Sequence, residues 1–507
     1  MADLVNLGDI LRLPALGHRA AYVDLRNPDQ PRELTAFQLD VLTVSIARGL
    51  VNRGIGAGDR VGIVSANRME FFAAYSGAMR MGAVAVPVNF KLPPATLVHI
   101  FRDSEIKLAF TDQARAPLIP GGIPAINFDE ESFEAFQSPG SQQTFVPGER
   151  ELAEILYTSG SGGPPKGVPL THRGQLWALE IHREPLHADQ ALVYTPVVAP
   201  LYHMNGLFFT TVALMNRMTV ISLPHFDPRA YLETVARWRC TVLSGIPTMF
   251  AMMVRERELI SRLDFGFVRA VTIGSAPLTD TLLGQVQKLF PNADVRIGFG
   301  TTEVGPSVFG PHPDGLPKPP LSLGYPLGSI EWRLADGPTS DEGVLALRTP
   351  ALMDGYLNLP KVTAQKMQDG WYMTGDVLRR DSNGFFFFVG RADDMFVCGG
   401  ENIYPGEIEK LLEKHAGVAQ AAVVPAPDDI KGQVPVAFLI PRPGTRLDAD
   451  EIKQYALEYG PAYAYPRFVV IRDELPVSGT HKIDRVSLIA EAAELSRSAR
   501  RASGISC

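Results

Sequence analysis

The chain has 507 residues, of which 46% are hydrophobic and 20% are charged. This length predicts about three folding units, or one large domain with a small one, and it allows cores that need no disulfides or metals. The formal net charge is −7, from 48 basic and 55 acidic residues. Proteins that bind nucleic acid are usually basic, so the acidic composition argues against nucleic-acid binding as the main function.

The cysteines and the lengths of the apolar stretches indicate in which cellular compartment the protein is expected. Cys240, Cys398 and Cys507 are far apart and fit no metal-ligand spacing, so we expect reduced thiols rather than a disulfide framework. The N-terminus lacks the uninterrupted apolar core of a signal peptide. No stretch reaches the roughly 18 to 20 apolar residues of a spanning helix. We therefore expect a cytoplasmic protein without an integral membrane segment.

The N-terminal part alternates between helical and strand patterns. Residues 37–55 carry apolar side chains at three- and four-residue spacing and predict a helix that ends at Gly54. A β-rich run at 60–67, a helix at 69–82 and a strand at 83–90 follow. Further strands are expected at 192–198, 217–223, 241–247 and 268–274. Such alternation favours an α/β fold with parallel sheets flanked by helices.

A different pattern begins near residue 325, where short strands and tight turns predict a β-rich subdomain. The pair Asp336-Gly337 between β-rich flanks is typical of a hairpin turn. Beyond the aromatic run at 384–391, a compact helix–strand pattern predicts a small α+β unit. The expected organisation is a large N-terminal domain over 1–390, a hinge at 391–394 and a C-terminal domain over 395–507.

The densest glycine cluster is YTSGSGGPPKG, residues 157–167. Glycines let backbone N–H groups converge, and hydroxyls and one lysine add the donors and the charge that a polyphosphate needs. It is not a P-loop, because Pro165 and Gly167 flank Lys166 where that motif requires glycine before the lysine and Ser or Thr after it. From these residues alone, a phosphate site and a flexible surface loop are equally supported.

A second cluster, GFGTTE at residues 298–303, is similar to a dinucleotide fingerprint whose third glycine has become Glu303. A carboxylate repels a pyrophosphate unless a divalent cation lies between them, so Glu303 suggests Mg²⁺ rather than NAD. Phe299 can lie against a purine. Taken alone, this segment is more simply an ordinary strand-to-loop turn.

Three later segments are weak signals separately. Asp376 follows a tight turn and can accept hydrogen bonds from ribose hydroxyls, although solvated turn aspartates are commoner. GRADD at 390–394 comes next, and Lys482 lies on the glycine-containing loop 476–485. Their order and spacing along the chain, together with the two glycine clusters, are much more specific.

Together these motifs resemble those of the adenylate-forming superfamily, which includes acyl-CoA synthetases, nonribosomal peptide adenylation domains and beetle luciferase. The resemblance implies that a carboxylic acid attacks the α-phosphorus of ATP to give an acyl-adenylate and pyrophosphate. A thiol then displaces AMP. The implied cofactors are ATP, Mg²⁺ and CoA, and a homodimer is one possible assembly.

The resemblance also assigns the nucleotide-binding residues. Those expected to wrap the β- and γ-phosphates are Thr158, Ser159, Gly160, Ser161, Gly163 and Lys166. Those expected along the adenine are Gly274, Ser275, Ala276, Pro277 and Phe299. Asp376 and Arg391 would hold the ribose hydroxyls. Thr302 would serve the α-phosphate, and Glu303 would bind Mg²⁺.

The small domain has two roles in this family, because it rotates between the half-reactions. Lys482 would bridge the carboxylate and the α-phosphate in one orientation, neutralising charge on the pentacoordinate phosphorus. In the other, the loop with Gly399 and Gly400 would face the pantetheine. Asp393 occupies the hinge position of this mobile domain. Three departures are Gly162 in place of a threonine, His481 in place of a glycine, and Phe299 in place of a frequent tyrosine.

The segment PLYHMNGLFF at 200–209 matches the part of the family that lines the acyl pocket, with His203 at the position that often gates it. Its neighbours are apolar, and no acid is placed to hold an α-amino group, which favours a fatty or aryl acid. The resemblance thus predicts an AMP-forming acid–CoA ligase with Lys482, Thr302, Glu303 and His203 as catalytic residues. Alternatives are a ligase that loads a carrier protein and a non-catalytic ATP-binding scaffold.

Overall fold

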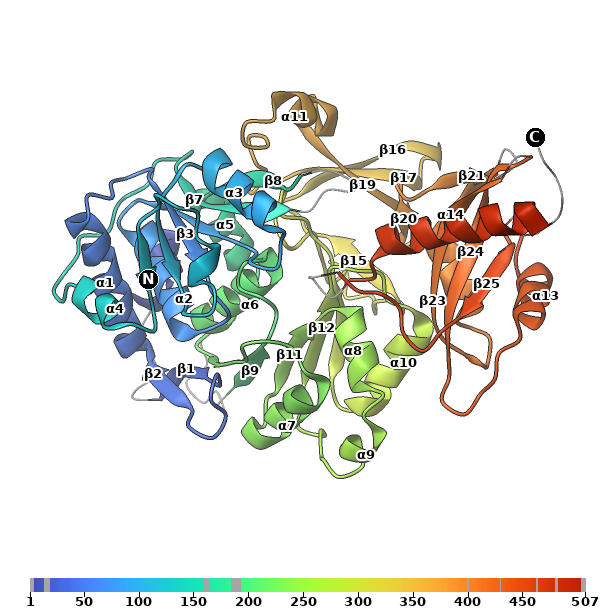
Figure 1. The fold of residues 1–507 in the computed structure, drawn as a ribbon, viewed down its shortest axis with the longest axis horizontal. Coiled ribbons are helices and arrows are strands. Elements are labelled where there is room, and N and C mark those ends of the chain that lie inside the picture. Colours follow the sequence, from blue (N-terminus) through green and yellow to red (C-terminus); the bar gives the residue numbers. More distant parts are fainter. Residues whose placement is uncertain are drawn as a thin grey trace.

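The computed structural model describes residues 4–12, 19–158, 164–183, 193–398, 401–428, 430–461, 464–478 and 482–502. A large N-terminal part, coloured blue to yellow in Figure 1, packs beside a smaller C-terminal part in orange and red. Within these described ranges, no helix combines the length and the hydropathy needed to cross a bilayer.

The first sheet of the large part has the strand order β6-β5-β3-β4-β7-β8, and its pairs are parallel except for β7 with β8. Its strands are β3 (Arg60–Val64), β4 (Val84–Pro87), β5 (Ile106–Thr111), β6 (Ala125–Asn127), β7 (Leu152–Thr158) and β8 (Lys166–Thr171). The helical segments around it are η1 (Leu7–Arg12), α1 (Ala36–Asn52), α2 (Met69–Arg80), α3 (Pro94–Asp103), η2 (Ala116–Leu118), α4 (Glu131–Phe136) and α5 (His172–Glu180).

The local sequence explains where the first two helices lie. Thr35 and Gln38 form a capping box that starts α1, and the helix ends at Asn52, just before Gly54 with its φ of 77°. Every residue of α2 is buried, including Arg80, whose guanidinium lies 3.0 Å from Asp9 and 2.6 Å from Asp40. A charge that would be costly when unpaired is thus compensated inside a fully buried helix.

Two more sheets complete the α/β portion. One has the order β2-β1-β10-β9, and the other is the parallel sheet β11-β12-β13. Their strands are β1 (Ala20–Asp24), β2 (Arg32–Thr35), β9 (Tyr194–Val197), β10 (Thr219–Ser222), β11 (Val242–Gly245), β12 (Ala270–Gly274) and β13 (Asp294–Gly298). Their helices are α6 (Met204–Met215), α7 (Pro228–Trp238), α8 (Pro247–Met253), α9 (Arg257–Ile260) and α10 (Asp280–Leu289). The strands predicted at 192–198, 217–223, 241–247 and 268–274 are therefore present as β9, β10, β11 and β12, each shorter than predicted by a few residues.

The β-rich portion is an antiparallel sheet of order β14-β15-β20-β19-β17-β16, with β18 beside β19. Its elements are β14 (Phe309–Gly310), β15 (Ser322–Pro326), β16 (Glu331–Thr339), β17 (Glu342–Arg348), α11 (Pro360–Lys366), β18 (Met367–Gln368), β19 (Trp371–Arg380) and β20 (Phe386–Arg391).

The predicted hairpin exists, but the turn predicted at Asp336-Gly337 is wrong. Those residues lie inside β16, at a register irregularity between Ala335 and Thr339, and Asp336 has a φ of 54°. The chain instead reverses between the paired residues Thr339 and Glu342. Asp341 is held there by Arg380, whose Nη2 lies 2.6 Å from its Oδ1. A bulge and a hairpin turn both accept positive φ, so the dipeptide alone did not distinguish them.

The C-terminal part has a hydrophobic core of its own, formed by residues from Phe396 to Ala492. Its sheet has the order β22-β21-β24-β23, with β25 parallel to β24. The elements are β21 (Phe396–Cys398), β22 (Glu401–Ile403), α12 (Pro405–Leu412), β23 (Val418–Asp428), β24 (Gly432–Pro441), α13 (Ala449–Tyr459), β25 (Phe468–Ile471) and α14 (Arg485–Ala502). In Figure 1, α14 begins near the centre of the molecule and runs outward to the C-terminus.

Candidate functional site

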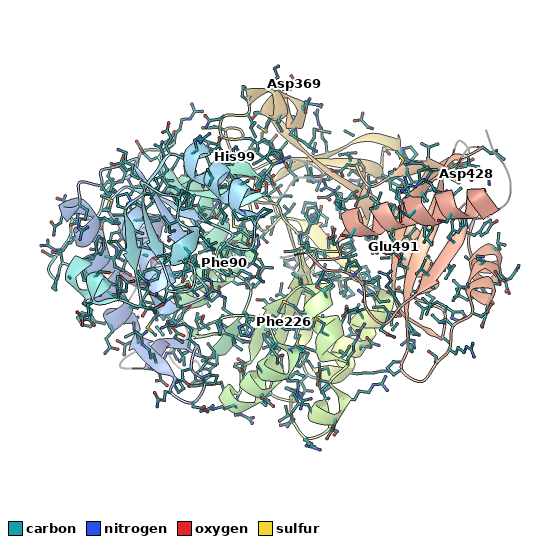
Figure 2. All side chains as sticks on the ribbon, viewed as in Figure 1. Phe90, His99, Phe226, Asp369, Asp428 and Glu491 are labelled. Atoms are coloured by element: carbon teal, nitrogen blue, oxygen red, sulfur yellow. The ribbon has the colours of Figure 1, made fainter. Side chains whose placement is uncertain are left out.

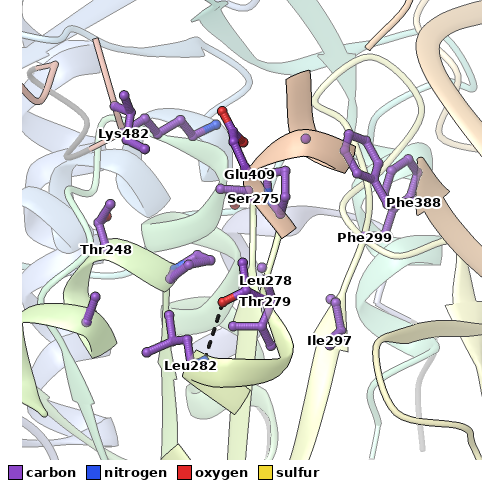
Figure 3. A pocket seen from close by; sticks show the side chains of 18 of the residues that line it. Thr248, Ser275, Leu278, Thr279, Leu282, Ile297, Phe299, Phe388, Glu409 and Lys482 are labelled. Carbon is purple, nitrogen blue, oxygen red and sulfur yellow. Dashed lines mark hydrogen bonds between the residues drawn. The ribbon is translucent and has the colours of Figure 1, made fainter. Parts of the chain in front are cut away.

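A cleft of about 1140 Å³ lies between the two parts. Residues of the large part, from the ends of β12, β13, β19 and β20, line it together with residues of α12 and with Lys482. Figure 3 shows Lys482 extending across the cleft above Ser275, with Phe299 and Phe388 at the other side. Contacts that hold the small part here include Lys410 Nζ to Phe388 O at 3.0 Å and Thr281 Oγ1 to Glu413 O at 3.2 Å.

One wall of the cleft comes from two adjacent parallel strands. Gly274 at the end of β12 is paired with Gly298 at the end of β13, so the segments after both strands emerge at the same edge. A Cβ on Gly274 would lie 3.1 Å from the carbonyl oxygen of Gly298, which keeps the two backbones close. Ser275 then adopts a φ of 65°, and this turn leads the chain along the cleft.

A chain of charges crosses the strand pair β19–β20. Asp376 is paired in register with Arg391, whose Nη1 lies 2.8 Å from Asp376 Oδ1 and whose Nε lies 3.0 Å from Asp393 Oδ1. Burial raises the pKa of Asp376, and the charge of Arg391 offsets part of that effect. Burial lowers the pKa of Arg391, but its two carboxylate partners raise it more, so this guanidinium stays charged. The arrangement presents an oriented carboxylate and a fixed cation to the cleft.

Glu303 is 8% exposed and is held by two tyrosines that the motifs did not indicate. Tyr356 donates its hydroxyl to Glu303 Oε1 at 2.8 Å, and the Tyr356 and Tyr372 hydroxyls are 3.2 Å apart. Burial and the Glu303 charge raise the pKa of both phenols. Lys166 Nζ lies 5.1 Å from the centre of the Tyr356 ring. These two tyrosines lie in loops and strands without a spacing signal, so sequence reasoning could not find them.

The donor set at Glu303 fits Mg²⁺ held jointly with a polyphosphate. Among the described residues there is no group of three His, Cys, Asp or Glu side chains that could hold a metal alone. Mg²⁺ commonly takes one or two carboxylates together with phosphate oxygens and waters. One oriented carboxylate beside Lys166 in a cleft of this size meets that requirement.

Lys482 belongs to the small part yet lies in the cleft with Asp376 and Arg391. Lys482 is exposed to the solvent that fills the cleft. Protein atoms of both parts nevertheless lie close to its ammonium group. Desolvation in the cleft lowers the pKa of its ammonium, and Asp376 opposes that shift. Asp376 is thus close to one cation from each part of the chain.

His203 precedes α6 and does not cap the helix with its side chain. Its ring packs edge-on against Tyr202 with 4.7 Å between centroids, and its Nε2 has no hydrogen-bond partner. Burial, with a smaller effect of the Lys482 charge, lowers the pKa of His203 to about 4. His203 is not itself part of the cleft lining, whereas the next residue, Met204, is.

The structure brings most of the predicted site residues together. Those that line the cleft are Thr158, Lys166, Gly274, Ser275, Ala276, Pro277, Phe299, Thr302, Glu303, Asp376, Arg391, Asp393 and Lys482. The predictions at Ser159, Gly160, Ser161, Gly163, Gly399 and Gly400, and the departures at Gly162 and His481, lie outside the described residues. Phe299 also packs on Phe309, with 5.6 Å between ring centroids.

Residues 14–357 match the family model for the AMP-binding enzyme, and residues 407–482 match that for the AMP-binding enzyme C-terminal domain. The chain belongs to the AMP-binding enzyme family. This confirms the predicted adenylate-forming superfamily, and the cleft that joins the two matched regions is its candidate active site.

Curated relatives cover nearly the whole chain. A feruloyl-CoA synthase from Amycolatopsis is 31% identical over 466 residues, which are 89% of this chain and 92% of that protein. The fatty acid–[acyl-carrier-protein] ligase ScoC from Streptomyces coeruleorubidus is 30% identical over 484 residues, with 90% and 91% covered. The 2-succinylbenzoate–CoA ligase of Bacillus cytotoxicus is 30% identical over 471 residues, with 90% and 93% covered.

Solved structures agree with the fold. The anthranilate CoA ligase AuaEII in complex with anthranoyl-AMP has a TM-score of 0.86 at 26% identity, with 98% of this chain and 99% of that chain covered. The O-succinylbenzoate CoA synthetase of Bacillus subtilis in complex with AMP has a TM-score of 0.79 at 25% identity, with 95% and 97% covered. The predicted fold class, α/β with a small C-terminal domain, is confirmed.

The buried imidazole of His203 should remain neutral at pH values where most histidines are charged. Between about pH 6.5 and 4 the folded protein binds fewer protons at His203 than the unfolded chain, so this residue makes stability fall as the pH falls. NMR titration of labelled histidines, assigned with His203→Gln, should give a midpoint near 4. Lys482→Ala should shift that midpoint upward, and a midpoint near 6.5 in the unaltered protein would contradict the burial seen here.

Proposed function

We propose that the chain is an AMP-forming ligase that activates a hydrophobic carboxylic acid, fatty or aryl, with ATP and transfers the acyl group to CoA. One observation carries this proposal: Lys482 of the small part shares a cleft with Asp376, Arg391 and Glu303 of the large part. A cation that reaches the site from a separate unit suits a reaction in which one step needs the charge and the next does not.

The nucleotide would lie along the edge formed by β12 and β13. Residues 274–277 and Phe299 would border the adenine, and Asp376 would accept hydrogen bonds from the ribose hydroxyls with Arg391 beside it. Thr158 and Lys166 would contact the terminal phosphates. Mg²⁺ bound at Glu303 would neutralise phosphate charge and so favour attack at the α-phosphorus. Tyr356 and Tyr372 would fix the direction of the Glu303 carboxylate.

Adenylation needs two anions, the carboxylate and the triphosphate, to approach each other. In this proposal Lys482 would lie between them, and Thr302, which lines the same cleft, would donate its hydroxyl to the α-phosphate. The lowered pKa of Lys482 reflects desolvation, and binding two anions beside it would favour its charged form. His203 comes just before the cleft-lining Met204, and its neutral ring would add no charge near the acyl group. These fixed charges would stabilise the pentacoordinate transition state.

Thioester formation would then follow a rotation of the small domain about a hinge at residues 391–394. Asp393 is the pivot in this proposal. Its two carboxylate oxygens accept hydrogen bonds from Nε and Nη2 of Arg391, each 3.0 Å long. Rotation would remove Lys482 from the cleft and bring the loop with Gly399 and Gly400 toward the acyl-adenylate. We keep the boundaries 1–390 and 395–507 for the two domains.

A second cavity favours CoA over a carrier protein as the thiol donor. This cavity of about 550 Å³ is lined by cations from four positions, Arg26, Arg68, Lys91 and Arg115, against the carboxylates of Asp112 and Asp129. Phe90 and Phe226, labelled in Figure 2, lie on its wall. The Arg115 guanidinium lies 4.5 Å from the centre of the Phe90 ring.

Arginines beside flat aromatic rings suit the phosphorylated nucleotide of CoA, although here they are also paired with Asp24, Glu70, Asp112 and Asp129. The cavity lies near the active site along the chain, since Tyr202 lines the cavity and Met204, two residues later, lines the cleft. A carrier protein would bring the same pantetheine arm but no adenine nucleotide, so this cavity would have no ligand in the alternative reaction.

We further propose a cytoplasmic location, which the two described free cysteines, Cys240 and Cys398, support because both are buried thiols without a disulfide. A homodimer stays a prediction.

Lys482→Ala should abolish acyl-adenylate formation, because Lys482 is the cation proposed to lie between the two anions. The same variant should still convert supplied acyl-adenylate and CoA to thioester at near the original rate. Pyrophosphate release and thioester formation, measured separately, test this. Equal loss of both half-reactions would contradict the rotation proposed for the small domain.

Arg115→Ala should raise the KM for CoA by about 10- to 150-fold, since a charge-assisted phosphate contact is worth roughly 1.5 to 3 kcal/mol. Its KM for pantetheine, which lacks the nucleotide, should not change. Arg150→Ala is the matched control, because Arg150 is an exposed arginine paired with Asp354 away from both cavities. If Arg115→Ala affected CoA and pantetheine alike, the nucleotide assignment of this cavity would be wrong.

A further inference from the structure

The connection from β17 to α11, residues 349–359, joins two segments of the cleft wall that are far apart in the sequence. Met353 N donates a hydrogen bond of 2.9 Å to the carbonyl oxygen of Glu303. Four residues later, Leu357 N donates a hydrogen bond of 2.9 Å to the carbonyl oxygen of Gly167. This connection therefore fixes the backbones of the two segments relative to each other.

Tyr356, one residue before Leu357, repeats this link with its side chain. Its hydroxyl donates to Glu303 Oε1 at 2.8 Å. The Nζ of Lys166, the neighbour of Gly167, lies over the Tyr356 ring at 5.1 Å from its centre. A phenol O–H binds a carboxylate in the plane of the ring, whereas the face of the ring attracts an ammonium. One side chain, only 6% exposed, thus contacts an anion and a cation through different parts of the same ring.

The position of the Tyr356 ring is set by the protein itself. The backbone N–H of Tyr356 donates to Thr363 Oγ1 in α11 at 2.9 Å. Gly355 has a φ of 148°, and a Cβ there would lie 2.7 Å from Thr363 Cγ2, so the chain passes close to α11 just before the tyrosine. At the far end of the ring, the Tyr372 hydroxyl lies 3.2 Å from the Tyr356 hydroxyl. The ring is therefore preorganised, and ligand binding does not have to order it.

Contact through a ring keeps two opposite charges apart. Glu303 and Lys166 are both described and line the same cleft, yet no ion pair joins them. A direct pair would neutralise both groups, and it would have to be broken before either group bound a ligand of its own. Held by Tyr356 instead, the carboxylate can still bind a cation and the ammonium can still bind an anion.

We propose that Tyr356 is a positioning residue that couples the metal subsite to the subsite of the terminal phosphates. Its hydroxyl orients the Glu303 carboxylate, which would hold Mg²⁺, and its ring face holds the Lys166 ammonium, which would contact the phosphates. One rigid ring thus sets the separation of the two charges. This assignment rests on the proposed ligase function and goes beyond it, since it adds the contact to Lys166 and the coupling of the two subsites.

The test measures ATP binding at equilibrium by isothermal titration calorimetry without an acid substrate, once with Mg²⁺ and once with EDTA. The Kd in EDTA divided by the Kd in Mg²⁺ reports the contribution of the metal. Tyr356→Phe keeps the ring and removes the hydroxyl. It should lower this ratio by about 10- to 100-fold, as loss of a group that orients a metal ligand does, and it should leave the Kd in EDTA unchanged.

Tyr356→Leu removes the ring as well as the hydroxyl. It should also raise the Kd in EDTA by about two- to tenfold, because the phosphates must then order the Lys166 side chain. In a Lys166→Met background, Tyr356→Phe and Tyr356→Leu should bind metal-free ATP equally, since the ring then has no ammonium to hold. A difference that persists in that background would show a general loss of packing and would overturn the role of the ring.

Tyr75→Phe is the matched control variant. Tyr75 donates its hydroxyl to Glu154 Oε2 at 3.1 Å, and both residues are buried and outside the cleft lining. This variant should change neither Kd. An unchanged ratio in Tyr356→Phe, or an equal rise in both of its Kd values, would overturn this inference alone. Absence of ATP binding to the unaltered protein would instead overturn the proposed ligase function.

Discussion

The buried carboxylate of Asp376 is the charge on which the arrangement of the cleft depends. Within the large part, it is paired across β19 and β20 with Arg391, which in turn binds Asp393. Asp376 also counteracts the desolvation of Lys482, which comes from the other part of the chain. A single carboxylate thus makes it favourable for cations from both parts to share one cleft.

This dependence links the cleft to domain rotation. Arg391 and Asp393 lie at the start of the segment that leaves β20, so the side chains that hold the charge network also border the proposed hinge. Among the described residues, two of the contacts between the parts are hydrogen bonds to backbone carbonyls, from Lys410 and from Thr281. A small domain that is held by such contacts and by electrostatic attraction to Asp376 can leave when the anions it neutralises have reacted.

Much of the fold and of the site was predictable because the chemistry concentrates in glycine-rich segments at strand ends. The alternation of helices and strands located β11 and β12, and the motifs singled out Gly274 at the end of β12 and Phe299 and Glu303 further along the chain. The register that pairs Gly274 with Gly298 was not predictable, because strand order in a parallel sheet depends on long-range packing. The turn at Asp341 was missed for a related reason, since its partner Arg380 comes from the neighbouring strand β19.

The residues that sequence reasoning missed have no spacing of their own. Tyr356 and Tyr372 reach Glu303 from different segments, and the ring of Tyr356 also lies under Lys166, which is distant in the sequence. Each acquires its role only when the chain folds. The hydrogen bonds of Met353 and Leu357 to Glu303 and Gly167 likewise become evident only when these distant segments are placed side by side.

The central claim is that the cleft is assembled from both parts of the chain and must open between the half-reactions. A short thiol–thiol crosslink between Thr281→Cys on α10 and Lys414→Cys, next to Glu413, would fix the contact observed between those segments. The crosslinked enzyme should release one equivalent of pyrophosphate and retain the acyl-adenylate without forming thioester, and reversal of the crosslink should restore thioester formation. Full thioester formation in the crosslinked enzyme, or no adenylation at all, would contradict the account.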